Sequence, residues 1–329
     1  LSSEHGVLKS ANEIAVVGHR VAHGGQYFSE SALVTEQVKE RIEECIELAQ
    51  LNNTANLRGI LAMEKLWQGV TQVVVFDSSF HQSMEPNDFL YGLPYEYYEK
   101  YKVRRYGFHG TSHKFVAKKA CKLVGWNWEE KKVISCHLGN GASVAAIKNG
   151  KSVDTSMGFT PVEGLVMGTR AGNLDLGALL FIAEKEDLTI PDTNNMINKH
   201  SGVLGISGLS SYRHNIEMAM EEGNERAKLA FDMFNYRVSI YIGSYAAAMG
   251  GVDLILFTGG IGENGWDMRS EVCKDLEFLG VDFDFELNDK KRGVDLELTK
   301  PGSRKKVVTV TTNEELVIAQ DTQKIVSNL

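Results

Sequence analysis

Short apolar runs rich in valine and isoleucine alternate along this chain with longer segments of helical periodicity. Such runs are shorter than ordinary helices and match buried strands. Strands that alternate with helices are typical of α/β folds, in which helices cover a largely parallel sheet. We expect strands at residues 13–17, 72–76, 132–138, 252–258 and 306–310, and helices at 31–50, 54–68, 111–125, 215–249 and 313–327.

Two local signals predict a turn and a helix start within this pattern. Two alternating runs between Ala142 and Thr155 are joined by Asn149-Gly150, and an Asn-Gly pair in that position predicts a tight β-hairpin turn. Asn313 is followed by two acidic residues, which is the signature of a capped helix start.

The length of the chain favours two domains. Its 329 residues exceed one average domain, so two hydrophobic cores are expected. The sequence contains no low-complexity tract and no flexible linker. We therefore expect two α/β domains joined by crossing helices, with a cleft between them.

Composition excludes several classes of protein. A net charge of -8 gives no general attraction for nucleic acid or for an anionic membrane, so any anion site must be local. The four cysteines form no CxxC pair, which favours a reduced, cytosolic protein over a zinc or disulfide framework. No signal peptide is recognisable, and the most apolar stretch, residues 227–250, predicts a buried core helix.

Glycine-rich turns that carry polar side chains follow several of the predicted strands. GHRVAHGG (18–25) offers Arg20, a planar cation suited to a carboxylate or a phosphate. In RRYGFHGTSH (104–113), a turn at 110–112 begins a helix and places His109 beside its positive end. A solvated surface turn is the alternative for the first segment, and a structural histidine is the alternative for the second.

Two further turns suit a phosphate. In HLGNGAS (137–143), the glycines let the backbone approach an anion, and Asn140 can bond to an oxygen. In MGTRAGNLD (167–175), Arg170 stands among small residues that leave it accessible to a ligand. An ordinary hairpin corner is the alternative for the first of these segments.

The last turn, FTGGIGENG (257–265), raises a competing interpretation. It satisfies G-x-G-x-x-G after a strand, with Asp282 and Asp284 further on, as in a Rossmann dinucleotide site. Too few residues follow Gly265 for a complete doubly wound domain, and this interpretation leaves the other turns without a role.

Together these segments resemble the acetate kinases, in the order and spacing of that family, over essentially the whole chain. The resemblance is carried by GHRVAHGG, FDSSFHQSM (76–84), YGFHGTSH, HLGNGASVAAIKNGKSVDTSMGFTPVEGLVMGTR (137–170), SGVLGISGLSS (201–211), FTGGIGEN and TTNEELVIAQDT (311–322).

The resemblance implies two similar α/β domains of the actin, Hsp70 and sugar kinase type. The implied division is 1–77 with 315–329 for the first domain and 78–314 for the second, which binds nucleotide and dimerises. The implied reaction is direct phosphoryl transfer between ATP and acetate with Mg²⁺ or Mn²⁺, in a cytoplasmic homodimer. Such transfer depends on positioning and on charge stabilisation.

The resemblance also assigns roles to residues. Arg20 and Arg170 would hold the acyl phosphate, and His109 would hydrogen-bond the transferring group. Glu314 would be the Mg²⁺ ligand, and Asp77 would be the matching catalytic acid near the cleft. The pocket for the acyl methyl group would consist of Ala22, Leu51, Phe108 and Pro161. The nucleotide and its phosphates would contact His137, Asn140, Gly141, Gly260, Ile261, Gly262 and Asn264.

The chain departs from the family pattern at three places. It begins at Leu1 without the family's N-C-G-S-S-S phosphate loop, so we expect a fragment or a processed product. Tyr212-Arg213-His214 replaces the acid, apolar residue and arginine expected beside the adenosine, which predicts loose nucleotide discrimination. The remaining departures are Asn52-Asn53-Thr54 and AGNLDL (171–176).

Two alternatives stay open. The first is a propionate kinase, because Ala22 stands where the family usually has valine against the acyl methyl group. The second is a catalytically silent fragment that keeps ligand binding and dimerisation, since the phosphate loop is missing.

Overall fold

The computed structural model describes residue 10 and residues 13–329, which form two compact units. Unit 1 comprises the described residues up to Ser83, Phe108–Thr111 and Asn313–Leu329, and unit 2 comprises Met84–Gly107 and Ser112–Thr312. Unit 1 thus includes residues 78–83, 108–111, 313 and 314, which the division predicted from sequence assigns to the second domain.

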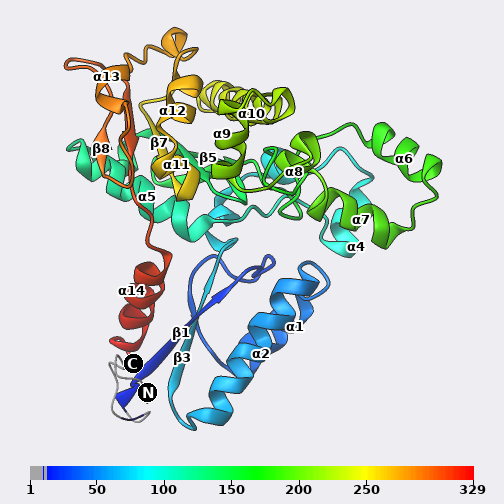
Figure 1. Ribbon diagram of the computed structural model, residues 1–329. Helices are drawn as coiled ribbons and strands as arrows, with labels where there is room; N and C mark the ends of the chain where they lie inside the picture. The colour runs from blue at the N-terminus through cyan, green and yellow to red at the C-terminus, as the bar shows by residue number, and fades with distance from the viewer. Residues whose placement is uncertain (1–9, 11–12) are drawn as a thin grey trace. The chain divides into compact units, whose positions relative to one another are not determined.

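Unit 1 is built on a three-stranded sheet in the order β1-β3-β2 (Figure 1). β1 (Val16–Val21) runs parallel to β3 (Thr71–Phe76), and the short β2 (Ala32–Leu33) pairs antiparallel with β3. Parallel neighbours need a long crossover connection. Here the crossover contains β2, α1 (Glu36–Glu44) and α2 (Gln50–Leu66).

Helices cover both faces of β1. α14 (Glu314–Val326) packs on β1 and β3, where a Cβ added to Gly18 would lie 2.5 Å from Thr322 Oγ1. Val21 instead clusters with Ile60 of α2. Because side chains alternate along a strand, Arg20 faces the same side as Gly18, the side that α14 covers.

Unit 2 is built on a six-stranded sheet in the order β6-β5-β4-β7-β9-β8, in which β4, β7 and β9 are parallel and the other pairings are antiparallel. The strands are β4 (Lys132–Leu138), β5 (Ala142–Lys148), β6 (Lys151–Thr155), β7 (Leu254–Thr258), β8 (Leu296–Glu297) and β9 (Lys306–Thr309).

The predicted hairpin is confirmed. β5 and β6 are joined by Asn149 and Gly150, whose φ angles of 53° and 77° are those of the tight hairpin turn that an Asn-Gly pair favours.

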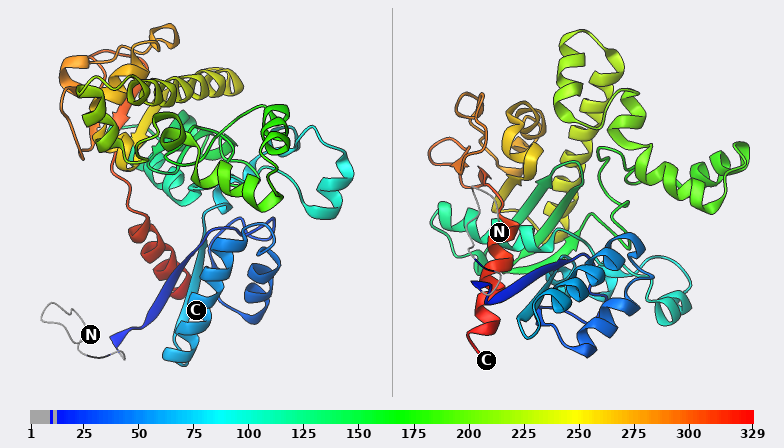
Figure 2. Two further views of the ribbon diagram at one scale, coloured as in Figure 1. Left: turned by 45° about the vertical axis from the view of Figure 1, so that its right-hand side comes forward. Right: turned by 60° about the horizontal axis from the view of Figure 1, so that its bottom comes forward.

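Some helices of unit 2 pack on this sheet, and others extend away from it (Figure 2). The long α10 (Glu225–Met249) packs on β4 and β5, and α6 (Leu176–Lys185) and α7 (Ile190–Lys199) form an arm that extends from the rest of the unit. The other helices are α3 (Pro86–Phe89), α4 (Tyr95–Tyr101), α5 (Gly110–Leu123), α8 (Gly202–Ser207), α9 (Arg213–Glu221), α11 (Gly259–Asn264), α12 (Trp266–Cys273) and α13 (Phe285–Asn288). Short 3₁₀ turns span Ser79–Ser83, Trp128–Glu130 and Glu277–Leu279.

The structure corrects three of the predicted elements. The first strand is Val16–Val21 and not 13–17, because its pairing with β3 continues through Arg20 opposite Val75. The helix predicted over 31–50 starts only after Thr35, whose hydroxyl accepts a hydrogen bond from Val38 N. The helix predicted over 215–249 breaks at Gly223, with a φ of 84°, and restarts with Asn224 as N-cap.

In the part of the chain that the structure describes, no helix combines the length and the apolar character needed to cross a bilayer.

A partly buried cluster of charged side chains connects β6 with the segments that carry Arg105 and Glu163. Arg105 donates to Glu163 at 2.6 Å and to the backbone carbonyl of Thr155 at 2.8 Å, and its Nε lies 3.9 Å from Asp154. Burial raises the pKa of the Asp154 carboxyl to about 6, although Arg105 opposes the shift.

The pKa of Asp154 predicts how stability depends on pH. Because the pKa is higher in the folded chain, the folded state binds more protons than the unfolded state between about pH 4 and pH 6, and stability falls as pH rises through this window. Asp154→Asn should remove the part of this dependence that Asp154 causes and stabilise the protein at pH 7 by roughly 1–3 kcal/mol. Denaturant unfolding of both proteins at several pH values measures the effect.

Asp232→Asn is the matched control, since Asp232 is an exposed acid on α10 that pairs with Lys228. Equal pH profiles for the original chain and Asp154→Asn would contradict the prediction.

Candidate active site

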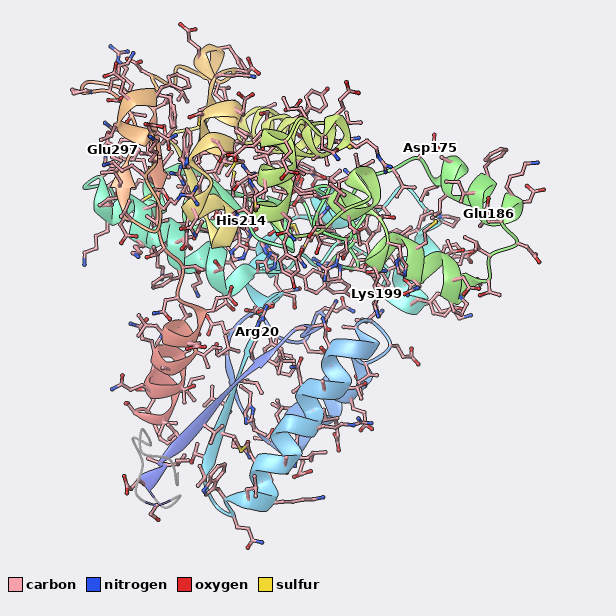
Figure 3. The ribbon with its side chains drawn as sticks, viewed as in Figure 1. Arg20, Asp175, Glu186, Lys199, His214 and Glu297 are labelled. Carbon is pink, nitrogen blue, oxygen red and sulfur yellow. The ribbon has the colours of Figure 1, made fainter. Side chains whose placement is uncertain are left out.

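Arg20, near the carboxyl end of β1, forms an ion pair with a buried acid (Figure 3). Its Nε lies 3.0 Å from both oxygens of Asp77, and its Nη2 donates to the second oxygen as well. Asp77 follows β3 directly, and its backbone N–H donates to Val21 O at 3.0 Å. Two adjacent parallel strands therefore bring the cation and the acid together.

The ion pair leaves part of Arg20 available to a ligand. The Asp77 side chain is 4% exposed and the Arg20 side chain is 50% exposed. Asp77 raises the pKa of the Arg20 guanidinium, whereas burial raises the pKa of the Asp77 carboxyl. The geometry favours the charged pair, since a bidentate guanidinium satisfies a buried carboxylate.

Glu314 is the second acid beside Arg20. It is the first residue of α14, and its carboxylate lies 3.8 Å from Arg20 Nε. Burial raises the pKa of Glu314; the charge of Arg20 lowers it, and the charge of Asp77 raises it again. Asp77 and Glu314 thus repel one another and share one cation.

These two acids suit a hydrated divalent cation. Magnesium prefers oxygen ligands and is often bound through one or two carboxylates while it keeps several waters. A cation there would offset the repulsion that raises the pKa of Glu314. Within residue 10 and residues 13–329, no cluster of three or more His, Cys, Asp or Glu is arranged to hold a metal ion, so the fit rests on this acidic pair.

His109 is held in an unusual backbone conformation. Its φ is 57°, which is uncommon for a residue with a Cβ. The neighbouring residues are fixed on each side: Phe108 O accepts from His81, and Gly110 N donates to Asp77 O at 2.8 Å. A Cβ at Gly110 would lie 2.4 Å from Asp77 O, so glycine is required there. The structure confirms that His109 immediately precedes a helix, α5.

Two residues of the predicted acyl pocket lie near the loop after β1. Ala22 N donates to Asn56 Oδ1, and His23 and Asn53 exchange two hydrogen bonds through their backbone and amide groups. The His23 ring meets the buried Phe108 ring edge-on at 5.7 Å. The side chain of Leu51, also predicted for this pocket, lies outside the described part of the chain.

Pro161 belongs to unit 2, in the loop that follows β6. Tyr91 shapes this loop, because its hydroxyl accepts from Phe159 N at 2.7 Å and donates to Glu163 at 2.5 Å.

His137 belongs to a buried network of hydrogen bonds in unit 2. Its Nδ1 lies 2.8 Å from the hydroxyl of Ser112, which also lies 2.8 Å from the hydroxyl of Thr312. His113 bonds through both ring nitrogens to Ser135 and Ser143. The Ser112 contact holds the His137 ring in one orientation.

The predicted phosphate turn packs against the loop that carries Arg170. Gly139 N donates to Gly141 O, Asn140 is exposed, and Gly168 N donates to Asn140 O at 3.0 Å. A Cβ at Gly168 would collide with the Asn140 side chain. The structure thus brings Asn140 and the Arg170 loop together within unit 2.

Arg170 differs from Arg20 in its surroundings. Among residues 13–329, no carboxylate pairs with it, and its Nη1 donates to Met167 Sδ at 3.8 Å. Burial lowers its pKa. A half-buried guanidinium without an acid is suited to an anionic ligand.

The predicted nucleotide turn is the short helix α11. Gly260 and Asn264 are exposed, Ile261 is half-buried and Gly262 is buried. Asn264 Nδ2 donates to Gly260 O at 2.9 Å, so the predicted adenine residues share one local framework.

The segment Tyr212-Arg213-His214, which departs from the family pattern, lies at the start of α9 and is only partly available to a ligand. Tyr212 and His214 are exposed, and His214 is labelled in Figure 3. Arg213 bonds to Glu217 and Asp267 at 2.7 Å each and lies over the Phe231 ring. Its guanidinium is therefore occupied within unit 2.

Asn53, Asn56 and Ser112 support the site and are not among the site residues predicted from the sequence. Ser112 lies in RRYGFHGTSH (104–113), the motif that also contains His109. Its place in that motif is the signal that could have identified it. The two asparagines act on backbone groups of the 22–25 loop, and no spacing in the sequence reveals such contacts.

Comparison with known proteins gives consistent matches. The model of the acetokinase family matches residues 1–320. The acetate kinase of Desulfitobacterium hafniense is 54% identical over 326 residues, covering 99% of this chain and 82% of that relative.

Two solved structures share the fold. The acetate kinase of Porphyromonas gingivalis superposes with a TM-score of 0.96 and 51% identity, over 98% of this chain and 81% of that one. A propionate kinase from Francisella tularensis superposes with a TM-score of 0.89 and 40% identity, over 95% of this chain and 80% of that one. These matches confirm the α/β fold class and the resemblance expected from sequence: the chain belongs to the acetokinase family.

Proposed function

We propose that this protein is an acetate kinase, which transfers a phosphoryl group between ATP and acetate and interconverts these with acetyl phosphate and ADP. The observation that carries the proposal is the Arg20–Asp77 ion pair with Glu314 beside it, in a chain that belongs to the acetokinase family. A fixed guanidinium beside two acids is suited to phosphoryl transfer, which depends on charge placement.

The two arginines would act on the transferring group. Arg20 is fixed by Asp77 yet half exposed, and Arg170 has no acidic partner among residues 13–329. Both guanidinium groups would stabilise the negative charge that spreads over the phosphoryl oxygens. His109, held by its neighbours at a positive φ, would donate a hydrogen bond to the same group.

Glu314 would hold the Mg²⁺ or Mn²⁺ of the nucleotide, and the negative charge of Asp77 would attract the same cation. When bound, this cation neutralises phosphate charge and orients the phosphates. Glu314 is the more exposed of the two acids, with 24% of its side chain accessible against 4% for Asp77. We therefore assign ligand binding to Glu314 and the orientation of Arg20 to Asp77.

A cytoplasmic homodimer is part of the proposal. The four cysteines are buried and unbonded, as in a reducing compartment. The α6–α7 arm exposes large apolar side chains, with Leu176 and Leu180 each 70% accessible and Ile190 86% accessible. Exposed apolar groups gathered on one element are typical of protein interfaces.

The activity can be tested directly. We expect the purified protein, given acetate, ATP and Mg²⁺, to release ADP and to form acetyl phosphate, which hydroxylamine traps as the hydroxamate. Binding of ADP without any turnover would instead support the silent alternative.

Variants show whether the proposed site produces this activity. Arg20→Ala and Arg170→Ala should each lower kcat about 100-fold or more, the usual loss for one charge-stabilising donor. Arg41→Ala, which breaks an exposed pair with Glu44, should leave kcat unchanged. Unchanged turnover in Arg20→Ala with a lowered melting temperature would show that Arg20 is structural.

Propionate kinase remains the second candidate, because a solved propionate kinase shares the fold and Ala22 is small. Valine at this position would fill space that a further substrate carbon could occupy. A buried methylene contributes about 0.8 kcal/mol, and pockets discriminate one methylene by about 1–3 kcal/mol. Propionate should therefore be used within roughly tenfold of acetate.

Ala22→Val tests this assignment. The variant should lower kcat/KM for propionate roughly five- to tenfold relative to acetate, because the added methyl groups narrow the pocket. The measurement is the ratio of kcat/KM values for the two carboxylates in each protein. An unchanged ratio would mean that Ala22 does not line the acyl pocket.

A further inference from the structure

Glu263 of α11 is a hydrogen-bond hub that the proposed function does not use. One of its carboxylate oxygens, Oε1, accepts three hydrogen bonds. The donors are the hydroxyl of Thr258 at 3.2 Å, Gly259 N at 3.0 Å and Thr312 N at 3.0 Å. A charged acceptor with several backbone donors is among the stronger hydrogen-bonded arrangements in proteins.

The three donors come from two neighbouring strand ends. Thr258 ends β7, Gly259 begins α11, and Thr312 follows β9. β7 and β9 pair in parallel, so their carboxyl ends lie at the same edge of the sheet. Glu263 therefore joins the turn after β7 to the segment after β9.

The other end of α11 is fixed by a buried cation. Arg269 is completely buried, and its guanidinium donates to the carbonyl oxygens of Gly262 and Glu263 at 2.7 and 3.0 Å. Gly259 has a φ of 78°, and a Cβ there would lie 2.7 Å from Leu138 O. The first residue of α11 and its C-terminal end are thus both constrained, which restricts the conformation of the helix.

The segment held by Glu263 leads directly to the proposed metal ligand. Thr312 is held at two points, through its N–H by Glu263 and through its hydroxyl by Ser112. Thr312 is also the last residue of unit 2, and Glu314 follows two residues later. The carboxylate of Glu263 thus holds both the predicted nucleotide turn and Thr312.

We propose that Glu263 is a positioning residue for the nucleotide. It acts by holding residues 259–264 and Thr312 in one arrangement and makes no contact with the nucleotide itself. This inference rests on the proposed function, because it takes α11 as part of the nucleotide site.

Two variants separate the hydrogen bonds of Glu263 from its charge. Glu263→Ala leaves Gly259 N and Thr312 N without their acceptor. Glu263→Gln keeps an oxygen in place and loses only the charge. If Glu263 acts by accepting hydrogen bonds, glutamine should restore most of what alanine removes.

The experiment is calorimetric binding of ADP in the absence of acetate, with and without Mg²⁺. We expect Glu263→Ala to raise the Kd at least about tenfold, and Glu263→Gln to stay within about threefold of the original chain. The matched control is Glu297→Ala on β8, labelled in Figure 3. Glu297 accepts from Thr299 and Lys306, so the control also removes an acid with two partners but should leave the Kd unchanged.

Steady-state kinetics give a second readout. In Glu263→Ala, KM for ATP should rise while KM for acetate stays within about twofold, a split that a general loss of folded protein would not produce. A lower melting temperature with unchanged Kd and KM would overturn the proposal. Equal Kd values for the glutamine and alanine variants would also overturn it, because the charge itself would then act on the ligand.

The original chain separates this inference from the proposed function. If it binds ADP but phosphorylates no acetate, the proposed function fails while the Glu263 comparison still tests the inference. If it is active and Glu263→Ala binds ADP normally, the inference alone fails. If the original chain does not bind ADP, both are overturned.

Discussion

The ion pair between Arg20 and Asp77 is the interaction on which the proposed site depends. A buried carboxylate is costly unless it is paired and hydrogen-bonded, and Asp77 meets this condition through two-point contact with one guanidinium. β1 and β3 pair from Val16 opposite Thr71 through Val21 opposite Phe76. A different register would shift Arg20 along β3 and away from Asp77. The sheet of unit 1 therefore fixes where the cation points.

The alternation of side chains along β1 then decides what surrounds the pair. Arg20 faces the side covered by α14, whose first residue is Glu314. The backbone of Asp77 also bonds to Gly110 and so supports the strained conformation of His109. Asp77 thus supports two of the residues that we assign to phosphoryl transfer, Arg20 and His109. Glu263 has a corresponding role in unit 2, where it holds two neighbouring strand ends.

Much of this could be predicted from the sequence where local chemistry dominates. Asn149-Gly150 favours one type of turn in any context, and Asn313 caps its helix with its own side chain. The position of Arg20 inside a strand could not be predicted, because Gly18 and His19 interrupt the apolar pattern and only pairing with β3 extends the strand. Asn53, Ser112 and Glu263 were missed for a related reason. Asn53 and Ser112 have partners that are distant in the sequence, and so does Glu263 in its contact with Thr312; these groups become neighbours only after the sheets form.

The central claim is that Asp77 acts through Arg20, and a double-mutant cycle on kcat/KM for acetate tests it most directly. The four proteins are the original chain, Arg20→Ala, Asp77→Asn and the double variant, each checked for an unchanged fold by circular dichroism. If Asp77 serves to orient Arg20, the double variant should be no slower than Arg20→Ala, which corresponds to a coupling energy of about 1–3 kcal/mol. If the losses of the two single variants multiply in the double variant, the residues act independently and the account is wrong.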